Sequence, residues 1–346
     1  MLKNAIFYGF VHKNHEKENI FALNGVFLYQ IMDKCALSKA KMEQEKAKTL
    51  VEFKKCPCCN STEISKRFTC KDQFATGEMF DVFECSGCGF VFTQGFPDEK
   101  EIGRYYESQE YISHSNTSKG LINKIYHCVR SIMLRRKVRL VKRLTLLKSG
   151  KILDYGAGTG YFANAMKHAG WEVTAIEKSP GARKLAKEEL GMDLLPESAL
   201  PEIKEKAFDV VTLWHVMEHI QELGNFWDEL HRILDDTGIA IVAVPNCKSY
   251  DAAKYKEHWA AYDVPRHLWH FTPHAIMNYG EKHGFILERQ YTMPFDGFYI
   301  SMLSEKYKGN SMPGLRGFWN GFKGWCAQSR RKDASSSIIY VFRKKR

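Results

Sequence analysis

The 346-residue sequence lacks a long apolar segment, a secretion signal and any internal repeat. Its longest uncharged apolar stretch, residues 20–32, is shorter than the ~20 residues that a bilayer-spanning helix needs. The apolar run at residues 5–11 is followed by His12, Lys13 and Glu16 without a small-residue cleavage site, so we expect a cytoplasmic protein. With 44% hydrophobic and 26% charged residues, the sequence predicts a folded globular chain rather than a disordered one.

Acidic residues are almost missing from two stretches of the chain. Residues 111–153 contain eleven Lys and Arg and no Asp or Glu, and residues 305–346 contain eleven basic and two acidic residues. The net charge of +11 is therefore local. Such basicity suits an anionic cofactor, substrate or surface, nucleic acid included, although a solvated helix face has the same pattern.

Ten cysteines are too few, at this length, for a secreted disulfide scaffold. Four of them form two C-x2-C pairs: Cys56, Cys59, Cys85 and Cys88. This spacing predicts a zinc-ribbon-like module over residues 54–96, with short strands between the pairs. Four sulfur ligands leave no open position, so the expected Zn²⁺ is structural. Cys58 is a spare thiol that could replace one ligand, and buried free cysteines are the alternative.

The rest of the chain divides by its periodicity. Residues 1–53 form an N-terminal extension of uncertain order, and residues 97–149 form a linker and a basic amphipathic helix. From residue 150 to residue 346, strands alternate with helices. Strands are predicted at residues 151–154, 172–177, 209–214, 239–244, 285–292 and 336–343, and helices at residues 161–169, 180–190 and 224–234. This alternation predicts an α/β fold, in which helices cover both faces of a mainly parallel sheet.

A glycine-rich turn follows the first of these strands, in the sequence Asp154-Tyr-Gly-Ala-Gly-Thr-Gly160. Glycines there let a ligand approach the backbone closely, at the carboxyl end of a buried strand. The third glycine comes one residue too early for the dinucleotide fingerprint, and Asp154 would repel a pyrophosphate. A carboxylate here instead suits a ligand with a cationic amino-acid end. Glu177, at the end of the second strand, is placed to accept hydrogen bonds from ribose hydroxyls.

On these residues the sequence resembles the class I S-adenosylmethionine-dependent methyltransferases. The resemblance covers about residues 120–346 and implies a Rossmann-like, seven-stranded sheet that ends in an antiparallel pair. In that family the glycine loop holds the methionine end of the cofactor, a role that falls on Asp154, Gly156, Ala157, Gly158 and Gly160. The ribose role falls on Glu177 and, more weakly, an adenine contact on Ser198. The fourth-strand motif, residues 208–219, adds Trp214 and His215 to the pocket wall.

A hydroxyl or amine acceptor must also lose a proton, and histidine is the side chain best suited to take it near neutral pH. The candidates for this catalytic role are His215, His267 and His270, with His219 as a further one. The segment His215-x-x-Glu218-His219 resembles a metalloprotease motif, but that motif requires a helix, and this segment leaves a strand. In ubiquinone-biosynthesis O-methyltransferases an E-x-x-E-H segment here is associated with a divalent metal. This sequence has histidine at the first position, so a metal site and a simple pocket wall both remain open.

Two inserts are expected on the substrate side of the sheet. Residues 247–275 contain a dense run of Trp, Tyr, Arg and His, where Asp263, Arg266, His267 and His270 could bind an anionic acceptor or move a proton. Residues 297–332 predict a helical insert with an aromatic face. It could form a lid over the acceptor or a peripheral membrane contact, and core packing is the alternative in both inserts.

The resemblance implies an enzyme that transfers a methyl group from S-adenosylmethionine to a small-molecule, lipid or glycan-precursor acceptor, with oxygen as the expected acceptor atom. The main alternative is an RNA methyltransferase that docks through the ribbon and the basic helix. The ribosomal RNA enzymes of this architecture have a tighter ligand pattern that ends in histidine, from which this sequence departs. A non-enzymatic module that binds a partner is disfavoured by the intact glycine loop.

Overall fold

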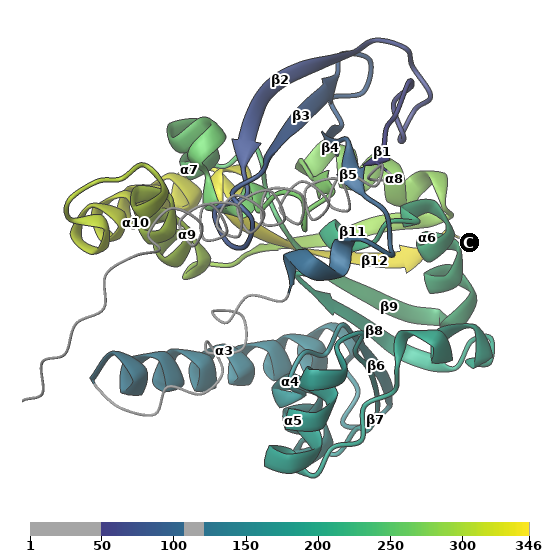
Figure 1. Cartoon of the computed structure of the whole chain (residues 1–346). Coiled ribbons are helices and arrows are strands. Elements are labelled where there is room, and N and C mark those ends of the chain that lie inside the picture. The colour runs from purple at the N-terminus through teal and green to yellow at the C-terminus, as the bar shows by residue number, and fades with distance from the viewer. Residues whose placement is uncertain (1–49, 107–120, 346) are drawn as a thin grey trace, which may run out of the picture. The chain divides into compact units, whose positions relative to one another are not determined.

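The computed structural model describes residues 50–106 and 121–345. The predicted N-terminal extension lies outside the described residues except for its last four. A six-stranded sheet with the order β11-β12-β9-β8-β6-β7 forms the centre of the described chain (Figure 1). Its strands are β6 (Lys151–Tyr155), β7 (Glu172–Ile176), β8 (Phe208–Trp214), β9 (Leu234–Pro245), β11 (Phe285–Thr292) and β12 (Ser337–Lys344).

The pairing of these strands confirms the predicted α/β fold. Strands β6 to β9 are parallel to their neighbours, and β12 runs antiparallel to both β9 and β11. At the β7 edge, the expected seventh strand is reduced to a single bridge between Ile176 and Leu195. Pro196 follows at once and caps the short helix η2 (Glu197–Glu202). The chain turns into η2 at this point, so the pairing with β7 ends after one bridge.

Successive residues of the central strands point to opposite faces, and each face is covered by helices. Ile152, Val210 and Ile241 pack with α3 (Leu121–Thr145) and α4 (Tyr161–His168). Leu153 and Val211 pack with α6 (Leu223–Ile233) and α8 (Pro273–Lys282) on the other face. The strands are apolar throughout because both faces are buried, which is the pattern of a parallel sheet.

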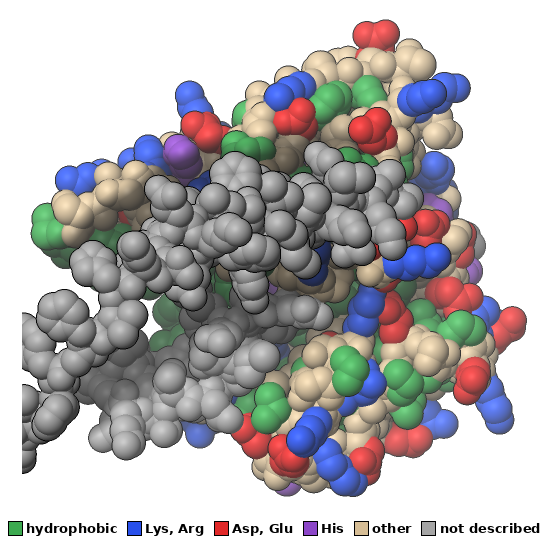
Figure 2. Space-filling model, viewed as in Figure 1, with side chains coloured by type: hydrophobic (Ala, Val, Ile, Leu, Met, Phe, Trp, Pro, Cys, Tyr) green, Lys and Arg blue, Asp and Glu red, His purple; other side chains and the backbone are tan. Residues whose placement is uncertain are grey.

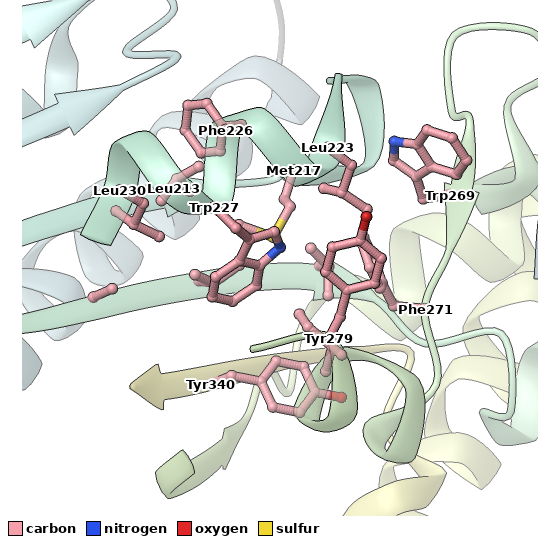
Figure 3. Close-up of a cluster of buried hydrophobic side chains, with 14 of the residues drawn as sticks. Leu213, Met217, Leu223, Phe226, Trp227, Leu230, Trp269, Phe271, Tyr279 and Tyr340 are labelled. Atoms are coloured by element: carbon pink, nitrogen blue, oxygen red, sulfur yellow. The ribbon is translucent and has the colours of Figure 1, made fainter. Parts of the chain in front are cut away.

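The core on the α6 side holds the chain segment that follows β8. Figure 3 shows Trp227 of α6 and Met217 close together between α6 and the sheet, with Tyr279 of α8 nearby. The Trp227 ring meets Phe285 and Phe342 edge-on, at centroid distances of 5.3 and 5.2 Å. Met217 is completely buried, so the residues on either side of it are fixed against the sheet.

The predicted helices agree with the observed ones to within one residue at each end, and α5 (Pro180–Leu190) matches in full. One strand is longer than predicted: β9 begins at Leu234, not at residue 239. Leu234 pairs with Phe208, and the register then shifts before Ile239 pairs with Val210. The residues of this bulge are polar, and in the sequence they look like a loop. In the structure, Asp235 Oδ1 accepts a hydrogen bond from the backbone N–H of Thr237 and closes a local turn within the strand.

The cysteine module consists of β2 (Ile64–Lys71), β3 (Met79–Cys85) and β4 (Val91–Gln94), paired antiparallel in that order. A fourth strand, β10 (Trp269–His270), comes from the predicted insert at residues 247–275 and pairs with β4. Phe90 and Phe92 of the module belong to the same buried cluster as Leu213 and Trp227. The module therefore shares a hydrophobic core with the large sheet. Two short strands, β1 (Leu50–Val51) and β5 (Phe96–Pro97), pair beside it.

The predicted helical insert contains two helices, α9 (Asp296–Tyr307) and α10 (Pro313–Arg330), which pack against each other (Figure 1). The shorter α7 (Tyr250–Tyr255) lies against both. None of the described helices is long and apolar enough to cross a membrane.

Arg266 ties three segments together in the interior. Its guanidinium donates to Asp72 of the module at 3.1 Å, to the Tyr105 carbonyl at 2.8 Å and to both carboxylate oxygens of Asp263. Arg266 and Asp72 are both buried. Arg266 was predicted as a contact for an anionic acceptor, but its donors are engaged by these protein groups. Its contacts indicate that it holds the module and the insert together.

We expect Arg266→Met to lower the free energy of unfolding by about 3–5 kcal/mol, because it leaves the buried Asp72 carboxylate without its cation. Urea unfolding followed by circular dichroism measures this change. The matched control is Lys66→Met, which breaks the exposed Lys66–Asp81 pair and should cost at most about 1 kcal/mol. Equal effects of the two substitutions would show that Arg266 contributes no more than a surface ion pair.

Candidate functional site

The glycine loop lies at the carboxyl end of β6, where it turns into α4. Gly156, Gly158 and Gly160 have φ angles of 72°, 56° and 77°, in the left-handed region that favours glycine. A Cβ atom on Gly156 would lie 2.4 Å from Val216 Cγ2, so this glycine is also required by close packing. A Cβ atom on Gly158 would meet nothing within 4 Å. Gly158 is half-buried, and the space beside it is open to a ligand.

Two predicted carboxylates flank this loop. Asp154 is buried at the end of β6 and accepts a hydrogen bond from the Thr212 hydroxyl at 2.8 Å. Burial raises the pKa of the Asp154 carboxyl above its ordinary value, while the Thr212 bond and nearby Lys137 oppose this rise. Glu177 follows β7 and accepts from the backbone N–H groups of Gly158 at 2.7 Å and Ser179 at 2.8 Å. The Glu177 carboxylate is thus fixed against the loop.

Lys137 of α3 is a site residue that the sequence reasoning missed. Its ammonium lies 4.1 Å from the centre of the Trp214 ring, and it interacts electrostatically with Asp154 and Asp296. Desolvation lowers the pKa of Lys137 below its ordinary value, and the two carboxylates oppose this. The Trp214 indole N–H is buried and has no hydrogen-bond partner among the described residues. A cation, an anion and an unused donor therefore meet at the ends of β6 and β8.

His215 comes directly after β8 and carries an unusual backbone. Its φ angle is 59°, a left-handed conformation that costs a non-glycine residue about 1 kcal/mol or more. Its Nε2 lies 3.1 Å from Asp296 Oδ2, and its Nδ1 lies 3.4 Å from Glu218 Oε1. Desolvation lowers the pKa of His215, but the two carboxylates more than reverse this and raise it to about 9. Asp296, which begins α9, was not predicted as a site residue.

The other two predicted catalytic histidines lie where the insert at residues 247–275 packs against the cysteine module. His270 is buried in β10, with its Nε2 3.0 Å from the Thr93 hydroxyl, and burial holds its pKa well below the ordinary value. These contacts indicate that His270 holds β10 against β4, and none of them supports a catalytic role. The Nδ1 of His267 lies 2.8 Å from the Ala261 carbonyl. Ser198, the predicted adenine contact, is exposed in η2, beyond the carboxyl end of β7.

His267 instead approaches a second group that follows β8. Donor atoms of Glu218, His219 and His267 all lie within 4.8 Å of one another. Both carboxylate oxygens of Glu218 are buried without a hydrogen bond from any described residue. Residues 217–219 form a single 3-10 turn, so the helix of a metalloprotease motif is absent here. The mixed imidazole and carboxylate donors fit a divalent cation, and the same contacts equally allow a plain pocket wall.

The four predicted cysteines come together in the module. Their sulfur atoms lie within 4.8 Å of one another, with Cys56 and Cys88 3.6 Å apart and Cys59 and Cys85 also 3.6 Å apart. Four thiolates held tetrahedrally at about 2.3 Å from Zn²⁺ would be about 3.8 Å apart, so the spacing fits this ion. Cys58, the possible substitute, contributes its backbone N–H to Cys56 Sγ and no sulfur to the group.

The segment that contains the glycine loop is similar to known methyltransferases. A family model described as "Methyltransferase domain" matches residues 129–290, which include Lys137, the glycine loop and His215. The ubiquinone biosynthesis O-methyltransferase of Rickettsia canadensis is 30% identical over 155 residues, covering 43% of this chain and 64% of that protein. The mitochondrial ubiquinone biosynthesis O-methyltransferase of Schizosaccharomyces pombe is 29% identical over 112 residues, covering 30% of this chain and 41% of that protein.

The chain spans less than two thirds of the length of either of these two curated relatives. Among solved structures, a 1,6-didemethyltoxoflavin-N1-methyltransferase from Burkholderia thailandensis aligns with 65% of this chain and 86% of that chain, at 16% identity and a TM-score of 0.40. The cysteine module and helices α9 and α10 lie outside the matched segment.

Proposed function

We infer that this chain, which carries a class I S-adenosylmethionine-dependent methyltransferase domain, transfers a methyl group to an oxygen atom of a small-molecule, lipid or glycan-precursor acceptor. The observation that carries this proposal is the glycine loop. A Cβ on Gly158 would meet open space, Glu177 is fixed against this loop and Asp154 is held at its start, at the carboxyl end of the sheet where α/β folds bind ligands. The curated relatives are named as O-methyltransferases, and this name supports oxygen as the acceptor atom.

The residues around the loop fit a zwitterionic amino-acid ligand with a ribose. Asp154 offers a negative charge for an ammonium group, and Lys137 offers a positive charge for a carboxylate. Glu177 is placed for ribose hydroxyls, and the unused Trp214 N–H can donate to a bound ligand. S-adenosylmethionine supplies a methyl group already activated by a sulfonium, so the protein mainly has to hold the acceptor in line.

We propose that His215 accepts the proton that the acceptor hydroxyl loses during methyl transfer. Asp296 and Glu218 hold its ring between them, so its orientation is fixed at the end of β8. Both carboxylates also raise the pKa of His215 to about 9, so the neutral ring that can accept a proton is a minor form near neutral pH, and the rate should rise as the pH approaches 9. Asp296 is the first residue of α9, and His215 follows strand β8. The packing of α9 against the sheet therefore determines how the His215 ring is oriented. Asp296 is therefore proposed as a positioning residue.

We expect His215→Gln to lower kcat by about a hundredfold or more, since general-base catalysis contributes about 10²–10⁴ in rate. The affinity for S-adenosylhomocysteine, measured by calorimetric titration, should stay within a few-fold. The matched control is His168→Gln at the end of α4, which should change neither quantity. A large loss of cofactor affinity with unchanged kcat would instead make His215 a wall of the cofactor pocket.

Transfer of radiolabelled methyl from S-adenosylmethionine into a fractionated cell extract tests the acceptor class. Label in a low-mass, lipid or glycan fraction supports the proposal and provides a molecule to identify. Label in a nuclease-sensitive polymer would replace this acceptor class with RNA. A protein that binds no S-adenosylhomocysteine would overturn the proposed activity as a whole.

We further propose that the four-cysteine group holds a structural Zn²⁺. The sulfur spacing, the burial of Cys56 and Cys85 and the four-sulfur donor set support this assignment. The ion would hold the two knuckles of the module together and would take no part in the chemistry at the glycine loop.

A further inference from the structure

Helix α10 presents large apolar side chains to the outside. Figure 2 shows hydrophobic side chains gathered on the surface at the end of the view where α9 and α10 lie. Each of five such side chains of α10 is between 38% and 57% exposed: Leu315, Phe318, Trp319, Phe322 and Trp325. We call this set the aromatic face. Exposed apolar patches of this kind mark sites of interaction with a protein, a ligand or a membrane.

The opposite side of α10 is small and polar, and it is the side that is buried. Gly317 approaches the Met302 backbone, where a Cβ would meet an atom at 2.4 Å, and Gly321 approaches the Phe298 backbone in the same way at 2.6 Å. Between them, Asn320 donates to Glu305 at 2.7 Å and to the Tyr255 hydroxyl at 2.9 Å. A helix of a globular protein normally buries its apolar side. In α10 this arrangement is reversed, and the glycine contacts leave no room for the helix to rotate.

The helical insert that carries the aromatic face is strongly basic. Residues 297–332 contain one acidic residue, the buried Glu305. The same stretch contains seven basic residues: Lys306, Lys308, Arg316, Lys323, Arg330, Arg331 and Lys332. All seven are exposed. An exposed aromatic stripe with tryptophan, flanked by Lys and Arg, is the composition of a helix that lies in the plane of a membrane surface.

We propose that the aromatic face of α10 docks on the surface of an anionic lipid bilayer, with the rings in the interface and the basic side chains on the headgroups. A second copy of this chain fits the face less well, because it would bring the same positive charges together. This inference goes beyond the proposed function and does not depend on methyl transfer. Since Asp296 at the start of α9 contacts His215, docking would fix the helix pair that borders the candidate site.

Intrinsic fluorescence gives a direct test, because only two of the seven tryptophans are exposed. Adding vesicles of equal parts phosphatidylcholine and phosphatidylglycerol to the full chain should shift the emission of Trp319 and Trp325 to shorter wavelength. Flotation of the same mixture should bring the protein to the top with the vesicles. Binding should weaken as salt is raised, and pure phosphatidylcholine should bind less. No cofactor or acceptor is added, so the result is independent of activity.

The variant Trp319→Ser/Trp325→Ser should partition at least about tenfold more weakly. The matched control is Met79→Ser, which removes an exposed apolar side chain of β3 and should leave binding unchanged. Both variants change exposed positions, and equal melting temperatures would show that folding is intact.

Two outcomes would overturn the proposal. One is an unshifted spectrum with protein that stays at the bottom of the gradient. The other is an increase in mass with protein concentration that the tryptophan variant abolishes, without vesicle binding, which would make the face a contact between copies of this chain.

Discussion

Asp154→Asn is expected to weaken the binding of S-adenosylhomocysteine by about thirtyfold or more. The substitution keeps the shape of the side chain and leaves an oxygen to accept from Thr212, but it removes the negative charge at the end of β6. Removing one partner of a buried charge pair costs about 2–5 kcal/mol of binding free energy. Asp154→Ala, which also removes the hydrogen bond, should abolish detectable binding. Calorimetric titration measures both affinities.

The stability of Asp154→Asn separates this role from a structural one. Because burial raises the pKa of Asp154, its charge costs stability in the free protein and is compensated only when a cationic ligand pairs with it, so a neutral amide should leave the melting temperature of the free protein nearly unchanged. The control is Asp209→Asn at the other end of the sheet, where the carboxylate accepts from Lys151 N at 2.7 Å. It should not affect affinity. Unchanged binding in Asp154→Asn would remove Asp154 from the cofactor site.

Local sequence determined most of the fold and the glycine loop. Strands such as β6 and β8 are apolar on both faces, so their burial is visible without a partner. The turn from Asp154 to Gly160 is equally local, because it needs positive φ angles that glycine supplies. The cysteine spacing also predicted which four sulfurs come together. In each of these cases the pattern and its physical cause lie within a few residues or within a repeated spacing.

The residues that sequence reasoning missed or misread depend on contacts between distant segments. Asp296 is 81 positions from His215, and no pattern links the two. Lys137 looked like one more cation on a basic helix, yet its position in α3 places it near Asp154. Arg266 looked available for an anionic acceptor until Asp72, 194 positions away, was found to accept from it. The sequence alone does not show whether a charged side chain is already paired with an opposite charge in the folded protein.

Cys59→Ser is expected to release the bound metal and to lower the melting temperature by more than about 10 °C. Structural zinc contributes about 10 kcal/mol or more to small zinc modules, and each kcal/mol corresponds to about 2–4 °C in a domain of this size. Cys59 is exposed, so its packing alone contributes little. Elemental analysis of the purified chain and a thermal melt give the two readings.

The controls for Cys59→Ser use cysteines outside the group. Cys70→Ala removes a buried sulfur of β2, and Cys58→Ala removes the neighbouring thiol. Both should keep one zinc per chain, and each should cost only about 1–2 kcal/mol. A metal role predicts that the exposed Cys59 matters more than the buried Cys70, and a pure packing role predicts the reverse order.

The shared core determines how far the loss of zinc should spread. Phe90 and Phe92 of the module pack in the same cluster as Trp227 of α6, and Trp227 in turn contacts β11 and β12. Removing the ion should therefore loosen the sheet as well, so we expect a single, lower melting transition and weaker cofactor binding. Two separate transitions, with cofactor affinity intact after the first, would show that the module is an independent unit that merely contacts the sheet.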